Sequence, residues 1–158
     1  MPRIHNPFVG REGYNCFACA PTNAHGLHME FFEEGEEVVS RWQPSLHHQG
    51  WGDILHGGIQ TTLMDEIASW TIFAKLHAAG MTTKMEIRFL KPVYISGGEL
   101  TVRARIAHSK RNLVRVETGI YDRQGEMVSE GSVYYYTFTP EQAREKLNLP
   151  GVEDFYRS

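Results

Sequence analysis

Residues 55–75 read LHGGIQTTLMDEIASWTIFAK, and this stretch decides the fold. After its glycine pair it runs without proline or glycine, and it is rich in apolar residues that suit a helix. At 100° per residue, one face would be apolar and the other would carry small polar groups. The apolar face holds Ile59, Leu63, Ile67, Trp70 and Ala74, and the polar face holds Gly58, Thr61, Thr62, Asp65 and Ser69. The stretch predicts one long helix whose polar stripe is either a solvent face or the wall of a cleft.

The predicted start of this helix carries its own chemistry. The first backbone N–H groups of a helix have no intrahelical partner and carry partial positive charge. Gly57 and Gly58 stand there and would let a ligand approach closely. A carbonyl oxygen at this point would be polarised, and negative charge developing on it would be stabilised. The alternative is that the glycine pair only forms a tight turn.

Gly57 and Asp65 are too far apart to serve one reacting group within a single helix. Eight residues of helix span about 12 Å, whereas catalytic groups lie about 3–3.5 Å from the reacting atoms. If both residues serve one site, a second copy of the chain must supply one of them. Two antiparallel helices related by a two-fold axis would achieve this, so the hypothesis predicts a homodimer with two equivalent interface sites.

The pattern of His56, Gly57 and Gly58 followed by Asp65 resembles that of hot-dog-fold acyl-CoA thioesterases of the phenylacetate-pathway type. The resemblance extends over residues 27–138 and includes residues 89–93, FLKPV. It implies an α+β hot-dog fold, in which an antiparallel sheet of five or six strands wraps around one long central helix. It also implies hydrolysis of acyl-CoA without a cofactor, with Asp65 as base or nucleophile and the Gly57 N–H bonded to the thioester oxygen. The expected assembly is a homodimer or a dimer of dimers.

The loop 43–54 adds further catalytic candidates. Many of the hot-dog thioesterases that this chain resembles place Asn or Gln seven residues before the first glycine, but this chain has Gly50 there. Gln49 is the adjacent candidate. His56 is a candidate for proton transfer, although a capping role at the helix entrance is the favoured interpretation. Ser69, one turn after Asp65, is placed to hydrogen-bond the carboxylate or the attacking water.

Substrate-binding candidates come from three places. Gly58, Thr61 and Thr62 belong to the polar stripe, and Trp51 lies in the loop before the helix. Arg111 lies in a basic hairpin, and arginine suits the phosphates of coenzyme A. A solvated strand face is the alternative for the basic residues, and a place in the core is the alternative for the aromatic ones.

Residues 1–26 form an irregular lead-in that carries two cysteines. Cys16 and Cys19 are followed by His25 and His28, an order of ligands that suits tetrahedral zinc. The gap between the pairs is shorter than in a zinc finger. The resemblance to the hot-dog thioesterases also brings the two cysteines without requiring metal. We therefore expect no metal. A redox dithiol is also disfavoured, because no strand precedes the pair.

The remaining patterns fix the domain organisation. The 158 residues suit one domain, expected at 27–139 between the lead-in and a short C-terminal helix and tail at 140–158. Alternating patterns predict strands at 27–32, 37–42 and 82–93, then three more as far as residue 138, and a helix stop at residues 79–80. A net charge of −3 gives no reason to expect nucleic-acid binding.

The same features set the expected location and leave other functions open. No apolar run reaches the length of a membrane span and no signal peptide is evident, so a cytoplasmic protein is expected. A hot-dog dehydratase acting on an acyl thioester and a non-catalytic acyl-CoA binding protein stay open as alternative functions.

Overall fold

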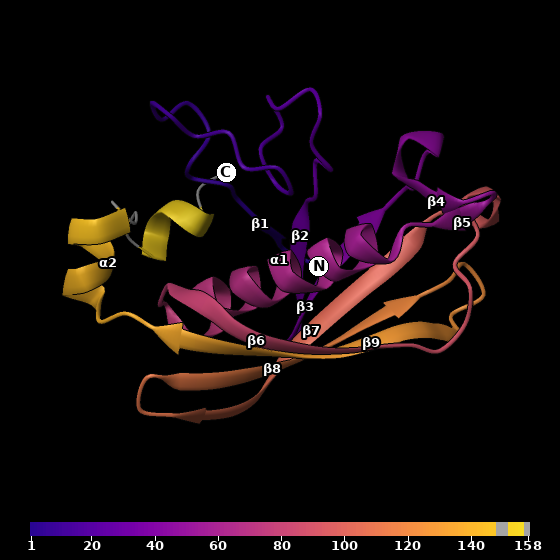
Figure 1. The fold of residues 1–158 in the computed structure, drawn as a ribbon. Coiled ribbons are helices and arrows are strands. Elements are labelled where there is room, and N and C mark those ends of the chain that lie inside the picture. Colours follow the sequence, from indigo (N-terminus) through magenta and orange to yellow (C-terminus); the bar gives the residue numbers. More distant parts are fainter. Residues whose placement is uncertain (148–151, 157–158) are drawn as a thin grey trace.

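The computed structural model describes residues 1–147 and 152–156 and consists of one long helix, α1, wrapped by an antiparallel sheet (Figure 1). The sheet has seven strands in the order β1-β2-β3-β7-β8-β9-β6. Its strands are β1 (Arg3–Ile4), β2 (Phe31–Glu34), β3 (Glu37–Trp42), β6 (Gly80–Phe89), β7 (Leu100–Lys110), β8 (Leu113–Tyr121) and β9 (Met127–Thr137). The remaining elements are the hairpin β4 (Gln49–Trp51) and β5 (Ile54–Leu55), the helices α1 (Gly57–Leu76) and α2 (Pro140–Leu147), and short 3-10 turns at Leu46–His48, Ile95–Gly97 and Val152–Tyr156. The predicted hot-dog fold is confirmed.

The sheet is wider than the predicted five or six strands, because β1 of the N-terminal segment pairs with β2. The strand predicted from Leu27 begins only at Phe31. His28 lies in the left-handed region with φ of 55°, which interrupts an extended chain. The strand predicted at 82–93 runs from residue 80 to residue 89. The predicted C-terminal helix is present, and the tail at 148–151 and 157–158 lies outside the described residues.

Helix α1 has a histidine as the capping residue at each end. His56 caps its first turn, and His77 ends it in a left-handed conformation with φ of 52°. The stop predicted at residues 79–80 is therefore slightly late, and Gly80 already opens β6. Within the described residues no helix is long and apolar enough to cross a membrane.

The predicted apolar face of α1 forms the centre of the core. Leu63, Ile67 and Trp70 are essentially inaccessible to solvent. The helix packs mainly over β7 and β8, whose inward residues alternate with charged outward ones. The inward set comprises Leu100, Val102, Ala104, Val114, Val116 and Ile120. This alternation gives the sheet an apolar face that packs on the helix, as in the hot-dog fold that the resemblance implies.

The side of α1 that faces away from the sheet is covered by the two chain ends (Figure 1). Trp70 stacks on Phe31 of β2 with ring centroids 4.7 Å apart. Phe8 and Phe155 meet the same indole edge-on at 6.4 and 5.9 Å. Residues far apart in sequence thus form one aromatic cluster that ties the N-terminal segment to the helix.

Replacing Trp70 with alanine should lower the free energy of unfolding by about 3–5 kcal/mol, because the side chain is 1% exposed and leaves a large cavity. Urea denaturation at a fixed protein concentration measures the change. Trp51→Ala is the matched control, since Trp51 is 85% exposed and should cost less than about 0.5 kcal/mol. Equal losses from the two variants would contradict the placement of Trp70 at the centre of the cluster.

Candidate active site

The entrance of α1 is built by His56. Its backbone N–H donates to the carbonyl oxygen of His48, which anchors the preceding hairpin. Its ring Nδ1 accepts the N–H of Gly58 at 2.8 Å. A side chain at position 58 would meet that ring at 2.9 Å, so glycine is needed there. His56 therefore acts as a helix cap, and the Gly58 N–H, an expected substrate contact, is already occupied.

Gly57 presents the free donor at this helix start. Within residues 1–147 and 152–156 its N–H has no hydrogen-bond partner. The His56 ring accepts the N–H of Gly58 instead. The ring of Phe89 lies over Gly57, and a Cβ atom at this position would approach it to 3.3 Å. Phe89 is itself 54% exposed at the end of β6. The Gly57 amide thus lies beside an accessible aromatic surface. A carbonyl bound there would accept its N–H and be polarised.

The loop before α1 explains the missing Asn or Gln. A side chain at Gly50 would meet the backbone of His56 at 3.0 Å, so the close packing of β4 on the helix entrance favours glycine. Gln49 is paired with Leu55 and is exposed, but its amide donates to the carbonyl oxygen of Gly52 at 2.6 Å. In this conformation the Gln49 amide is engaged within its own hairpin.

Asp65 is held by two groups from different strands. The hydroxyl of Thr82 on β6 donates to Asp65 Oδ1 at 2.7 Å, and the hydroxyl of Tyr135 on β9 approaches the same atom at 3.1 Å. Tyr135 also donates to the Asp65 carbonyl oxygen at 2.8 Å. Burial, reinforced by the charge of Asp65, raises the pKa of Tyr135 well above its usual value. The phenol therefore stays protonated and donates, which fixes Oδ1, while no hydrogen bond to Oδ2 is present among the described residues.

A β-bulge brings Thr82 to this carboxylate. The pairing of β6 with β9 shifts between Thr82 and Lys84, so Thr82 lies opposite Tyr135 and Lys84 lies opposite Tyr134. Strict alternation would have placed Thr82 on the outer face with Lys84. The extra residue, Thr83, turns Thr82 toward the helix, as bulges next to functional sites often do.

The other polar-stripe residues are placed less directly. Thr61 and Thr62 donate their hydroxyls to the carbonyl oxygens of Gly57 and Gly58, four residues earlier, at 2.9 Å each. Their oxygens can still accept a hydrogen bond, but their protons are used. Ser69 is half-buried one turn after Asp65, and no hydrogen bond joins the two in the described part of the chain.

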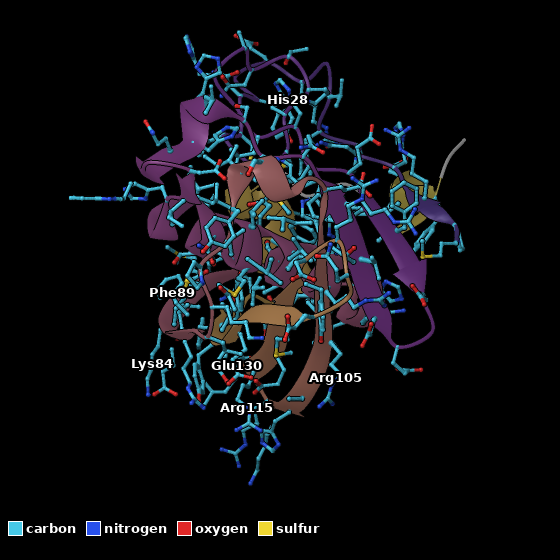
Figure 2. All side chains as sticks on the ribbon, turned by 90° about the vertical axis from the view of Figure 1, so that its right-hand side faces the viewer. His28, Lys84, Phe89, Arg105, Arg115 and Glu130 are labelled. Atoms are coloured by element: carbon cyan, nitrogen blue, oxygen red, sulfur yellow. The ribbon has the colours of Figure 1, made fainter. Side chains whose placement is uncertain are left out.

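The remaining candidates lie on other elements. Trp51 projects from the β4–β5 hairpin and is almost fully exposed. Arg111 occupies the β7–β8 turn with φ of 56°, next to the start of β6 and the end of β9. The predicted zinc ligands are not all brought together, because His25 is exposed and His28 bonds to the carbonyl oxygen of Asn23. Figure 2 shows His28 far from Lys84 and Phe89 on β6.

Gly57 and Asp65 contact opposite ends of the same edge strand, β6. Gly57 lies under Phe89, the last residue of β6, and Asp65 bonds Thr82 near its first residue. Among the described strands β6 pairs only with β9, so its outer edge carries no other strand of the described chain. Within one chain the two groups therefore remain separate, as the helical spacing predicted.

Comparison with solved structures identifies the fold class. A thioesterase from Haemophilus influenzae is 17% identical over 72% of this chain and 80% of that chain, with a TM-score of 0.64. A hypothetical thioesterase from Streptococcus pneumoniae, solved with coenzyme A, is 20% identical over 70% and 85%, also at 0.64. A Bacillus halodurans protein, solved with CoA, is 24% identical over 72% and 76%, again at 0.64. At these identities the likeness establishes a shared hot-dog fold.

A family model also matches part of the sequence. Residues 52–129, from the loop before α1 into β9, match the profile of the thioesterase superfamily. Over these residues the chain is similar to the thioesterase superfamily. No curated protein sequence is significantly similar to it.

Proposed function

We propose that the protein hydrolyses acyl-CoA thioesters at two equivalent sites in a homodimer, each built from Gly57 of one chain and Asp65 of the other. The observation that carries the proposal is that β6, an open edge strand, has the unbonded Gly57 amide at one end and the oriented Asp65 carboxylate at the other. The match of residues 52–129 to the thioesterase superfamily supports the reaction class. Two structural neighbours were solved with coenzyme A, which supports the class of substrate.

The open edge of β6 supplies the dimer contact. A ten-residue edge strand with exposed apolar side chains, Met81 and Phe89 among them, is a template for pairing with another strand. Antiparallel pairing of two β6 strands about Met85 would set the Thr82 end of one beside the Phe89 end of the other. Asp65 of one chain would then approach Gly57 of its partner, and Lys84 would oppose Glu86.

The proposed reaction uses few groups. The thioester oxygen accepts the Gly57 N–H, and Asp65 takes a proton from water as the water oxygen attacks the carbonyl carbon. Collapse of the tetrahedral intermediate breaks the carbon–sulfur bond, and the proton passes from Asp65 to the leaving sulfur. The products are a free acid and coenzyme A. Direct attack by Asp65, followed by hydrolysis of the anhydride, gives the same products and would be revealed by isotope from labelled water entering the aspartate.

A panel of acyl-CoAs of graded length, with aryl members included, tests the function directly. We expect catalytic release of the free coenzyme A thiol, followed with a thiol reagent, from at least one member of the panel. A dehydratase would change the acyl chain without releasing thiol, and a binding protein would release at most one equivalent. Binding without multiple turnovers across the panel would contradict the proposal.

Charge reversal on β6 tests the proposed dimer. Glu86→Lys would set like charges opposite one another twice across the two-fold axis and should weaken dimerisation by about tenfold or more. Lys84→Glu combined with Glu86→Lys should restore it, because opposite charges again face each other. Sedimentation velocity over a dilution series measures the association. A dimer equally strong in all three proteins would place the interface elsewhere.

A further inference from the structure

A group of side chains that can bind metal lies on a different side of α1 from the proposed active site. Cys16 and Cys19 of the N-terminal segment meet Glu66 of the helix, and their ligand atoms all lie within 4.8 Å of one another. Cys19 is 5% exposed, and the other two are partly buried. Glu66 follows Asp65 directly, yet it points to these sulfurs rather than to Thr82 and Tyr135.

We propose that Cys16, Cys19 and Glu66 bind one zinc ion. Two sulfurs and one carboxylate oxygen are ligands that zinc accepts, and the sulfurs disfavour magnesium and calcium. Three protein ligands leave a fourth position, which a water molecule completes in three-ligand zinc sites. The site stands independently of the proposed hydrolysis.

The separation between the Cys16 sulfur and the Glu66 oxygen fits a tetrahedral ion. With zinc–sulfur and zinc–oxygen distances of about 2.3 and 2.0 Å, neighbouring sulfur and oxygen ligands are separated by about 3.5 Å. Cys16 Sγ lies 3.7 Å from Glu66 Oε1. The separation therefore changes by only a few tenths of an ångström when an ion enters.

The backbone between the cysteines is already folded around the first sulfur. The N–H of Cys19 donates to Cys16 Sγ at 3.4 Å, and the N–H of Ala20 donates to the carbonyl oxygen of Cys16 at 3.1 Å. A backbone amide directed at a sulfur stabilises its thiolate, which is the form that binds metal. The turn thus holds the two sulfurs toward α1 before any ion arrives.

Groups around the cluster are arranged as supports for ligands. Trp70 Nε1 donates to Glu66 Oε1 at 3.1 Å. The Tyr14 hydroxyl lies 2.9 Å from Cys19 Sγ and accepts a hydrogen bond from the Asn6 amide, also at 2.9 Å. Outer hydrogen bonds of this kind fix the orientation of metal ligands and tune their affinity.

A cation explains the buried carboxylate better than a disulfide does. A Cys16–Cys19 disulfide would leave Glu66 beside sulfur with no positive charge to offset its burial. Among the described residues Glu66 forms no ion pair with a basic side chain. A zinc ion would place a positive centre in direct contact with the Glu66 carboxylate and the two thiolates, and it would fasten the N-terminal segment to α1 next to the Trp70 cluster.

Cobalt titration of the reduced, metal-free full chain tests the site. We expect thiolate-to-cobalt charge-transfer absorption that saturates at one equivalent and disappears when zinc is added. Cys19→Ser should lower the affinity by at least about a hundredfold, and the isosteric Glu66→Gln by at least about tenfold. The double variant His25→Gln and His28→Gln should bind as the wild type does, as should Asp65→Asn.

A measurement on the unmodified chain guards against misfolded variants. Zinc should slow the reaction of both thiols with a maleimide, counted by mass, while circular dichroism reports the fold. Thiols that react at the same rate with and without zinc would overturn the proposal. Unchanged cobalt affinity in Glu66→Gln would also overturn it, as would loss of binding in the double histidine variant.

Discussion

Replacing Asp65 with asparagine is expected to lower the turnover of acyl-CoA hydrolysis by at least about a hundredfold. The amide has the shape of the carboxylate, and its oxygen can still accept the hydroxyls of Thr82 and Tyr135. It cannot take a proton from water at neutral pH or serve as a nucleophile. The loss should therefore appear in kcat, while the fold and the dimer are retained.

The matched control for Asp65→Asn is Glu36→Gln, which removes one negative charge from an exposed turn of the β2–β3 hairpin. It should leave kcat and KM unchanged. Steady-state thiol release measures both variants, and sedimentation velocity checks the oligomer. Wild-type turnover in Asp65→Asn would refute the role of this carboxylate, and an equal loss in the control would show a non-specific charge effect.

Gly57→Pro should lower kcat by about a hundredfold, because it removes the amide proposed to stabilise the oxyanion. Gly57 is the first residue of α1, where proline is favoured and no intrahelical hydrogen bond is lost. The preceding residue, His56, has φ of −57° and ψ of 132°, which is compatible with a following proline. The substitution therefore deletes one hydrogen-bond donor with little change to the helix.

Gly57→Ala separates the amide from the added volume. Alanine keeps the N–H but places a Cβ atom 3.3 Å from the Phe89 ring, as the proline ring also would. Because Phe89 is more than half exposed, its ring can shift, and we expect a loss of less than about tenfold. Equal losses in the two variants would assign the effect to crowding at Phe89 and contradict a role for the amide.

Local periodicity made most of the fold predictable. The 3.6-residue pattern from Ile59 to Ala74 located α1 and its buried face, and alternation located β3 and β6–β9. β1 escaped prediction because two residues of an irregular segment carry no period, and their pairing with β2 is a long-range contact. The left-handed His28 likewise left no signal that would shorten the strand predicted from Leu27.

The surroundings of the site were less accessible from the sequence. Tyr135 shares the inward face of β9 with Val133, so alternation could have pointed to it within the run of three tyrosines. Thr82 reaches Asp65 only through the bulge at Thr83, which alternation predicts wrongly. The capping geometry of His56, which occupies the Gly58 amide, depends on a side-chain rotamer.

The cysteine cluster shows the same limit. Spacing along the chain suggested His25 and His28 as companions of Cys16 and Cys19, because only nearby residues are visible in a sequence pattern. The structure brings Glu66 to the sulfurs instead, from a helix fifty residues away. Contacts between distant segments depend on the completed fold.

Complementation between two inactive variants tests the shared site most directly. Chains carrying Asp65→Asn and chains carrying Gly57→Pro are each expected to be nearly inactive alone. When they are mixed, dissociated and reassociated, half of the dimers should be mixed. Each mixed dimer should have one site with both wild-type groups, which predicts recovery of about a quarter of wild-type activity. Recovery to that level would support one site built from two chains, and a mixture as inactive as its parts would contradict it.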